Sequence, residues 1–129
     1  MEEQNIARRI EGGSIFSPLH GARSLPSRYS NPGWPGVTLV DLASGVDTKE
    51  VFTSHLVRIA KGCEVSDHLH ESQWEWNAIL DGYGKVILGG REIPFKPGDT
   101  FTTPPGVRHT VVAGKEDVAL LAVFVPDPA

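Results

Sequence analysis

Residues 62–82 read GCEVSDHLHESQWEWNAILDG and carry the strongest structural signal in the chain. His68 and His70 are two positions apart, and side chains on an extended strand alternate with period two, so both imidazoles project to one face. A short bend then leads into a second expected strand, residues 73–80, which places Glu75 opposite the two histidines. The stretch therefore predicts two adjoining strands that bring two imidazoles and one carboxylate together.

A second informative run, residues 98–109, reads GDTFTTPPGVRH. Residues 100–103 favour a short strand, and the Pro-Pro-Gly sequence at 104–106 forces a turn after it, because proline fixes φ and glycine relieves the backbone. His109 follows the turn closely, so its ring is held with little conformational freedom. Three imidazoles and one carboxylate are the donors that a divalent transition metal prefers. The two runs together predict a metal site.

The two runs resemble the two sequence motifs of the cupin superfamily, in particular of its small single-domain members of the cupin 2 type. The matching positions are Gly62, His68, His70, Glu75 and Gly82 in the first motif and Gly98, Pro104, Gly106 and His109 in the second. In that family three histidines and one glutamate at these places bind the metal, which implies that the ligands here are His68, His70, Glu75 and His109. The one departure is Ala113, where cupins frequently have an asparagine that is not a ligand.

The resemblance implies an all-β fold, the cupin-type double-stranded β-helix that is also called a jelly-roll barrel. We expect residues 36–129 to form this single barrel domain and residues 1–35 to form an extended N-terminal arm, with one short helical turn at residues 5–11. The expected strands are residues 37–42, 51–60, 64–70, 73–80, 83–88, 91–95, 100–103, 109–113 and 118–125. Fourteen glycines and ten prolines agree with an all-β chain of frequent turns.

Composition and charge argue against several classes of function. The net charge of −4 and the lack of a basic stripe argue against a nucleic-acid partner. No apolar run approaches the roughly 18 residues that span a bilayer, and the opening residues lack the pattern of a signal peptide. The single cysteine, Cys63, excludes an intramolecular disulfide framework and is expected to be a buried or turn-lining thiol. We therefore expect a cytoplasmic protein without a membrane partner.

Large aromatic and histidine side chains outside the ligand pattern have structural expectations. On the strand that carries Glu75, Trp74 and Trp76 share the opposite face, so we expect them on the outside of the sheet or between two subunits rather than against a substrate. Exposed aromatic pairs often mark an interface, and cupins are often dimers, so we expect a homodimer. His20 and His55 are expected to be structural or exposed rather than catalytic.

The expected chemistry follows from the ligand count. Four protein ligands leave one or two positions open on an ion that accepts five or six, which is typical of a catalytic metal. Iron, manganese, nickel, zinc and copper all suit these donors. Our first hypothesis is a metal-dependent enzyme acting on a small organic molecule, with dioxygenase-type oxidation slightly ahead of decarboxylase, lyase or isomerase chemistry. Tyr83, Asn77 and Arg58 are the expected groups of the substrate pocket, because each lies on an expected strand near the metal.

Two alternatives stay open at this point. One is a non-catalytic module that binds or senses a metal or a small ligand. The other is a sugar-phosphate or sugar-nucleotide isomerase, which would need cationic side chains such as Arg91, Arg108 and Lys115 to converge on a phosphate.

Overall fold

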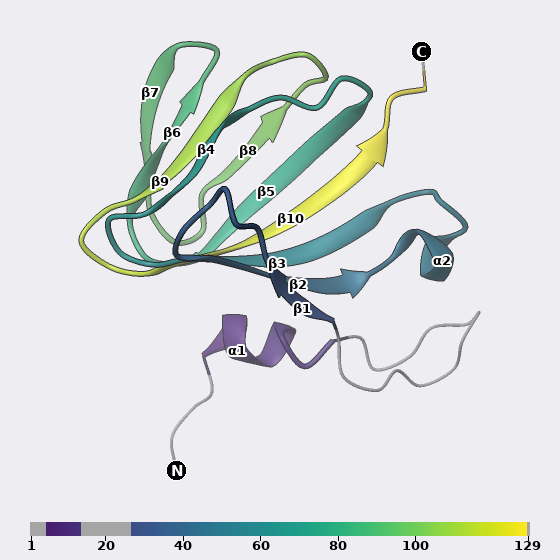
Figure 1. Ribbon diagram of the computed structural model, residues 1–129, viewed down its shortest axis with the longest axis horizontal. Coiled ribbons are helices and arrows are strands. Elements are labelled where there is room, and N and C mark those ends of the chain that lie inside the picture. The colour runs from purple at the N-terminus through teal and green to yellow at the C-terminus, as the bar shows by residue number, and fades with distance from the viewer. Residues whose placement is uncertain (1–4, 14–26, 129) are drawn as a thin grey trace.

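Two antiparallel sheets face each other in the computed structural model, which describes residues 5–13 and 27–128 (Figure 1). The larger sheet has the strand order β1 (Arg28–Ser30), β2 (Val37–Ala43), β3 (Thr53–Ile59), β10 (Val118–Pro126), β5 (Gln73–Asp81) and β8 (Thr100–Thr103). The smaller sheet has the order β4 (Glu64–His68), β9 (His109–Ala113), β6 (Gly84–Leu88) and β7 (Arg91–Phe95). This is the all-β jelly-roll arrangement that the sequence predicted.

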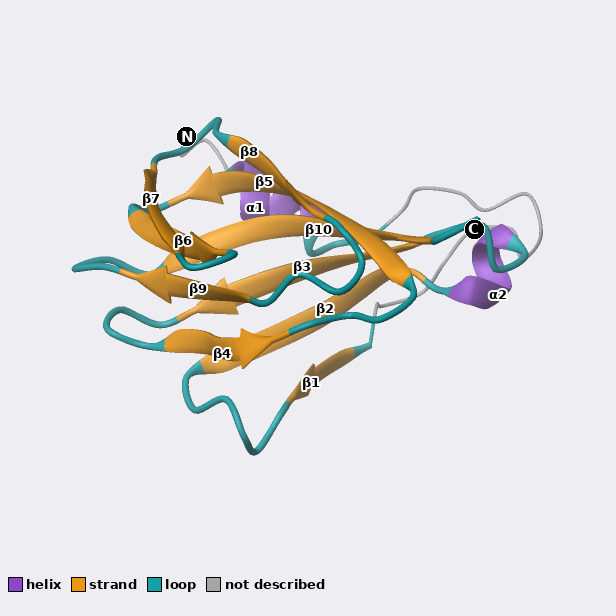
Figure 2. Cartoon of the chain, turned by 90° about the horizontal axis from the view of Figure 1, so that it is seen from above, coloured by secondary structure: helices purple, strands orange, loops and turns teal. Residues whose placement is uncertain are grey.

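All nine expected strands are present, and their ends fall within two residues of the expected ones. The expected helical turn of the arm is α1 (Ile6–Ile10). Two elements were not expected. β1 lies within the stretch assigned to the arm and pairs with β2, so the larger sheet begins before residue 36. α2 (Gly45–Thr48) replaces an expected turn, and it lies at the same end of the barrel as the C-terminus (Figure 2).

The larger sheet is buried on its inner face and, around β2, β3 and the start of β10, on its outer face as well. Its inner face packs against the smaller sheet in the main core. The residues of this core are Val37, Val57, Ile59, Ile79, Val118, Leu120 and Ala122 from the larger sheet, and Val65, Val86, Phe95, Val111 and Ala113 from the smaller one. Part of its outer face is covered by α1, whose Ala7 belongs to a second cluster with Val40, Leu56 and Ala119. The strand β3 therefore has apolar residues on both sides, Val57 inside and Leu56 outside.

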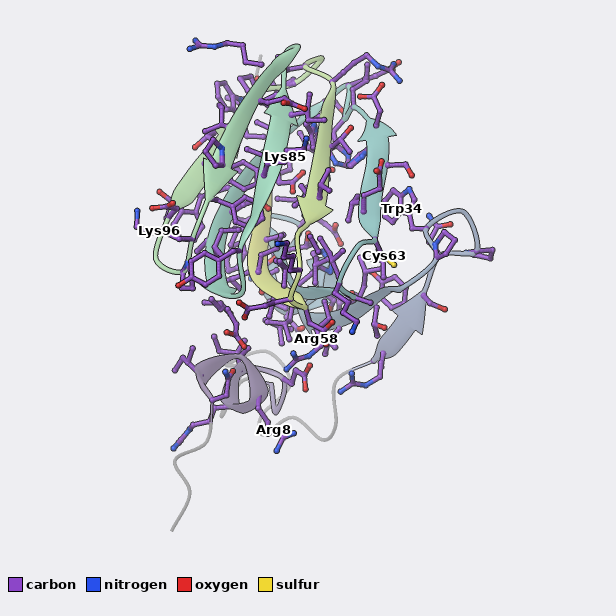
Figure 3. All side chains as sticks on the ribbon, turned by 90° about the vertical axis from the view of Figure 1, so that its left-hand side faces the viewer. Arg8, Trp34, Arg58, Cys63, Lys85 and Lys96 are labelled. Carbon is purple, nitrogen blue, oxygen red and sulfur yellow. The ribbon has the colours of Figure 1, made fainter. Side chains whose placement is uncertain are left out.

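The short helix α1 is fixed to the barrel at both ends. Before its first turn, the Asn5 amide donates a hydrogen bond to the Asp81 carboxylate (3.1 Å). After its last turn, Glu11 forms ion pairs with Arg58 and Arg28, and Arg58 lies between the barrel and the helix (Figure 3). Burial alone would raise the pKa of Glu11, but the two arginines outweigh it and hold this pKa below its usual 4.5.

The pairing of β10 with both of its neighbours arranges side chains in rows across the inner face of the larger sheet. The register partners are His55, Ala122 and Asn77 in one row and Thr53, Phe124 and Glu75 in the next. Residues directly opposite each other in an antiparallel pair point to the same face. Both rows therefore face the interior of the barrel, where Asn77 and Ala122 are buried.

The pairing of β10 with β5 is interrupted by an extra residue, Leu80. Asp81 pairs with Ala119, but the next pair is Ile79 with Leu120, so Leu80 has no register partner on β10. An extra residue of this kind is a bulge, and it shifts the alternation of the strand. Ile79 faces the interior, whereas Asp81 beyond the bulge faces outward, where the start of α1 binds it.

Candidate metal centre

The structure brings the four predicted ligands together from both sheets. His68 ends β4 and pairs with His109, which begins β9, while Glu75 lies on β5. His70 lies just beyond β4, and its carbonyl oxygen accepts a hydrogen bond from the Gly106 N–H (2.8 Å), which ties the first motif to the turn of the second. One donor atom from each of the four side chains lies within 4.8 Å of the others.

Backbone carbonyls set the tautomers of two of the imidazoles. His68 Nδ1–H donates to the Ser66 carbonyl oxygen (2.7 Å), and His109 Nδ1–H donates to the Val107 carbonyl oxygen (3.1 Å). Because a carbonyl only accepts hydrogen bonds, Nδ1 carries the proton on both rings. In the neutral imidazole, Nε2 is then left with a free electron pair, which is the arrangement that orients histidine ligands in metal sites.

Glu75 supplies the negative charge of the cluster. Burial by itself raises its pKa, but the neighbouring His109 and His70 outweigh burial and lower the pKa of Glu75 to about 2. Burial also acts to lower the pKa of His109, and the Glu75 carboxylate reverses this and raises it. The pKa of His68 is lowered by burial, against the opposing hydrogen bond to the Ser66 carbonyl. At neutral pH the centre therefore contains an ionised carboxylate.

The donor atoms fit a bound cation better than they fit one another. Glu75 Oε1 lies 3.2 Å from His70 Nε2 and 3.3 Å from His109 Nε2. These three atoms are nevertheless buried without a hydrogen bond of acceptable geometry. Buried polar atoms almost always have a partner, and leaving one unpaired costs roughly 1–3 kcal/mol. A divalent ion held by the four side chains would give all three atoms a partner.

The cluster forms part of the wall of a cavity of about 260 Å³. Apart from the four donors, the lining residues are Tyr29, Asn31, Trp34, Leu39, His55, Val57, Val65, Asn77, Val111, Leu120, Ala122 and Phe124. Most of these side chains are apolar or aromatic, and no lysine or arginine is among the lining residues in the described part of the chain. Such a cavity, with a few polar groups on apolar walls, is typical of a small-molecule site.

A sequence model of the cupin domain matches residues 55–124, which is more than half of the chain. The chain is a cupin. Its structure is similar to that of a Thermotoga maritima protein described as a predicted oxalate decarboxylase, with 30% identity, 78% of this chain and 91% of that chain covered, and a TM-score of 0.71. It is also similar to the polyketide cyclase RemF from Streptomyces resistomycificus, with 25% identity, 76% of this chain and 70% of that chain covered, and a TM-score of 0.66.

Similarity at lower identity shows the fold alone. KdgF from Halomonas sp. shares 23% identity with this cupin, with 72% of this chain and 84% of that chain covered and a TM-score of 0.64. No curated protein sequence matches this cupin. Across residues 5–13 and 27–128, none of its helices has the length and apolar character needed to cross a membrane.

Of the three expected pocket groups, the structure places only Asn77 in the cavity of this cupin. Asn77 is 0% exposed, and neither atom of its amide has a hydrogen-bond partner. Tyr83 does not line the cavity; it is 54% exposed in the turn between β5 and β6. Arg58 lies on the outer face of β3 with Glu11, which corrects the expectation for this residue. Because both faces of β3 are buried, the hydrophobic pattern did not show which one Arg58 takes.

A polar group at the cavity, made of His55, Asp41 and Tyr29, was not expected from the sequence. His55 lines the cavity, although it was expected to be structural or exposed. Its Nδ1 lies 2.8 Å from Asp41 Oδ1, and burial together with the same carboxylate raises the pKa of Tyr29, another lining residue, to about 12. The sequence held only a weak sign of this position: His55, Val57 and Ile59 are alternate residues of β3, and the last two face the interior. The other expectation of this kind, for His20, lies outside the described residues.

The cationic side chains of this cupin do not converge on the cavity. Arg91, Arg108 and Lys115 are absent from its described lining. Arg108 instead pairs with Asp67 on the surface (2.7 Å). The arrangement that a sugar-phosphate site would require is therefore not found in the described pocket.

Two tryptophans lie where strand alternation predicted them. Trp74 and Trp76 face away from the four donor side chains on the outer side of β5 and are 41% and 43% exposed. On the neighbouring strand, Val125 pairs with Trp74 and is exposed as well. The outer face thus carries an apolar patch, and a homodimer that covers it stays a prediction.

Proposed function

We propose that this cupin is a metal-dependent enzyme that acts on a small organic anion bound directly to a divalent transition metal ion. The observation that carries the proposal is the group of four donors on the cavity wall, three of whose buried atoms lack a hydrogen-bond partner. A divalent ion with three neutral imidazoles and one carboxylate has a net charge of about +1, which suits an anionic ligand. Iron, manganese, nickel, zinc and copper are the candidate ions.

The residues around the cluster prepare the site before a ligand arrives. The hydrogen bonds to the Ser66 and Val107 carbonyls keep the Nε2 atoms of two ligands available. The Trp34 ring lies 5.2 Å from the His68 ring and the Phe124 ring 5.0 Å from the His70 ring, so aromatic side chains limit the access of water to the cluster. Asn77 lies two positions after Glu75 on the same face and offers a donor and an acceptor to a bound molecule.

The reaction class is the second part of the proposal. A bound ion would supply Lewis-acid chemistry, and also redox chemistry with dioxygen if it can change its oxidation state. Dioxygenase-type oxidation is the first reaction to test. Decarboxylation and other non-oxidative reactions come next, and similarity to a protein described as a predicted oxalate decarboxylase and to a polyketide cyclase supports them. The apolar cavity walls fit an anion with an apolar body better than they fit oxalate, which has none.

Metal content and turnover test the proposal together. Wild type, His109→Ala and Tyr83→Phe are purified without chelator or nickel resin, reconstituted anaerobically with each candidate metal, and analysed for metal per chain. We expect a near-stoichiometric metal in the wild type and in Tyr83→Phe, whose side chain lies outside the cavity, and loss of the metal in His109→Ala. Oxygen consumption and product formation are then followed with a panel of small organic acids.

The outcomes separate the alternatives. A wild type that takes up none of the metals refutes the metal-dependent enzyme. A metal-loaded protein that binds organic acids but turns none of them over, with or without oxygen, favours the non-catalytic binding module. Turnover that needs no oxygen places the chemistry among decarboxylases, lyases or isomerases.

A further inference from the structure

A second polar group lies in the cavity wall away from the metal cluster. His55 Nδ1 is 2.8 Å from Asp41 Oδ1, and His55 Nε2 is 3.1 Å from Thr53 Oγ1. Burial and the nearby Asp41 carboxylate raise the pKa of Tyr29 to about 12, and both Tyr29 and His55 line the cavity. None of these four residues is among the predicted metal ligands. The hydrogen bonds hold the imidazole in one place on the wall.

The strand register places this group across a gap from the metal end. His55 on β3 and Asn77 on β5 are both partners of Ala122 on β10, which lies between them. Neighbouring strands are about 4.8 Å apart, so the two polar side chains begin roughly 10 Å from each other. Ala122 has the shortest side chain that a non-glycine residue can have, so it leaves space above the sheet between His55 and Asn77. The centroid of the apolar Phe124 ring lies 5.4 Å from the centroid of the His55 ring and 5.0 Å from that of the His70 ring.

We propose that His55, held by Asp41, is the substrate's second polar contact, and that the substrate is a small monoanion with a flat apolar body and a hydroxyl group at its far end. The inference rests on the proposed metal centre, which would hold the anionic end. The body of the substrate lies over Ala122 and against Phe124. Its hydroxyl group reaches the imidazole of His55.

The hydrogen-bond chemistry selects a hydroxyl group rather than a second anion. A carboxylate only accepts, so the proton on His55 Nδ1 is donated to Asp41, and Nε2 accepts from the Thr53 hydroxyl, which the hydroxyl group of a ligand would replace. The negative charge of Asp41 disfavours another carboxylate or a phosphate at this place. No lysine or arginine among the described lining residues offsets that charge. The chain therefore favours a monoanion over a dianion.

Matched ligands and variants test this subsite in the metal-loaded protein. Benzoate, 3-hydroxybenzoate, 4-hydroxybenzoate and the dianion terephthalate are titrated by calorimetry into wild type, His55→Leu and Asp41→Asn. We expect at least one hydroxybenzoate to bind the wild type roughly fivefold more tightly than benzoate, the value of one neutral hydrogen bond, and terephthalate to bind more weakly. In His55→Leu that advantage should disappear while the affinity for benzoate changes by less than about twofold, which isolates the pairwise interaction.

Two further variants control for indirect effects. Ala122→Val fills the space between the two polar groups, so it should weaken all the benzoates while metal content stays unchanged. Tyr83→Phe lies outside the cavity and should bind every ligand as the wild type does. Asp41→Asn keeps the shape of the side chain, and it should reduce the hydroxybenzoate advantage even if His55→Leu does not fold.

Several results would overturn the inference. The subsite is refuted, with the metal centre intact, if hydroxybenzoate still binds more tightly than benzoate in both His55→Leu and Asp41→Asn. It is also refuted if benzoate and both hydroxybenzoates bind with equal affinity, or if terephthalate binds most tightly. Absence of binding by all four probes to a fully metal-loaded protein would overturn it as well. A protein that binds no metal is recognised separately, because its metal content is measured before any probe is added.

Discussion

Replacement of Asn77 with valine should stabilise the ligand-free protein and weaken its binding of organic anions. Asn77 is fully buried, and neither its amide oxygen nor its amide nitrogen has a hydrogen-bond partner. A buried polar atom without a partner costs roughly 1–3 kcal/mol, and valine removes both such atoms and favours a strand. We therefore expect the free energy of unfolding to rise by about 2 kcal/mol or more, about 1 kcal/mol or more from each of the two atoms, which corresponds to about 3–5 °C in Tm for each kcal/mol at this chain length.

The assay is urea unfolding in the presence of EDTA, followed by tryptophan fluorescence, with calorimetry as a second measurement. Thr103→Val is the matched control. The Thr103 hydroxyl is also buried without a partner, but this residue does not line the cavity. Thr103→Val should therefore give a smaller gain in stability, from one atom instead of two, and should leave the binding of organic anions unchanged. Asn77→Val should weaken that binding.

Either half of this expectation can fail on its own. A loss of stability in Asn77→Val of more than about 1 kcal/mol would show that the amide makes favourable interactions in the ligand-free protein. Unchanged affinity for organic anions in the metal-loaded variant would show that Asn77 does not contact the ligand. A protein that is stabilised and loses its ligand would identify Asn77 as a residue kept for binding at the expense of stability.

Three further predictions concern the scaffold. The pKa of Glu11 in the folded chain lies below the usual 4.5, so above pH 4.5 Glu11→Gln should be less stable than wild type by about 1 kcal/mol or less. The difference in stability should vanish as the pH falls through the folded pKa of Glu11. Urea midpoints of the two proteins that still differ in acid would contradict this. Gly82→Ala should lose more stability than Gly90→Ala. Both glycines have positive φ (85° and 84°), but only at Gly82 would an added Cβ meet the Asp117 carbonyl oxygen, at 2.1 Å. Equal losses of stability in thermal unfolding would contradict the close contact. If a homodimer buries the outer face, Trp76→Arg should sediment as a folded monomer, and a monomeric wild type would refute the interface.

The fold and the four donors could be predicted because each has a periodic or spaced signal. His68 and His70 are two positions apart, Glu75 lies on the strand that follows a short bend, and His109 follows a Pro-Pro-Gly turn that restricts the backbone. One detail differs: β4 ends at His68, so His70 owes its position to the hydrogen bond between its carbonyl and the second motif, not to strand alternation. Long-range contacts of this kind leave no local pattern in the sequence.

The parts that sequence reasoning missed lack a pattern for physical reasons. β1 is three exposed residues long and has no apolar alternation, so only its pairing with β2 makes it a strand. Arg58 and His55 lie on β3, which is covered by α1 on one side and by the smaller sheet on the other. Odd-numbered and even-numbered positions along β3 both include apolar residues, so the pattern does not indicate which face is exposed to solvent. The role of His55 depends on Asp41, fourteen positions earlier, and their contact follows only from the register.

The bulge at Leu80 makes the two ends of β5 independent of each other. Under strict alternation Asp81 would face the interior together with Glu75 and Asn77, six and four positions before it. The extra residue turns Asp81 outward, so one strand gives a carboxylate to the candidate metal site inside and another to the N-terminal helix outside. Changes in the attachment of the arm can therefore accumulate at one end of the strand without rotating the donors at the other.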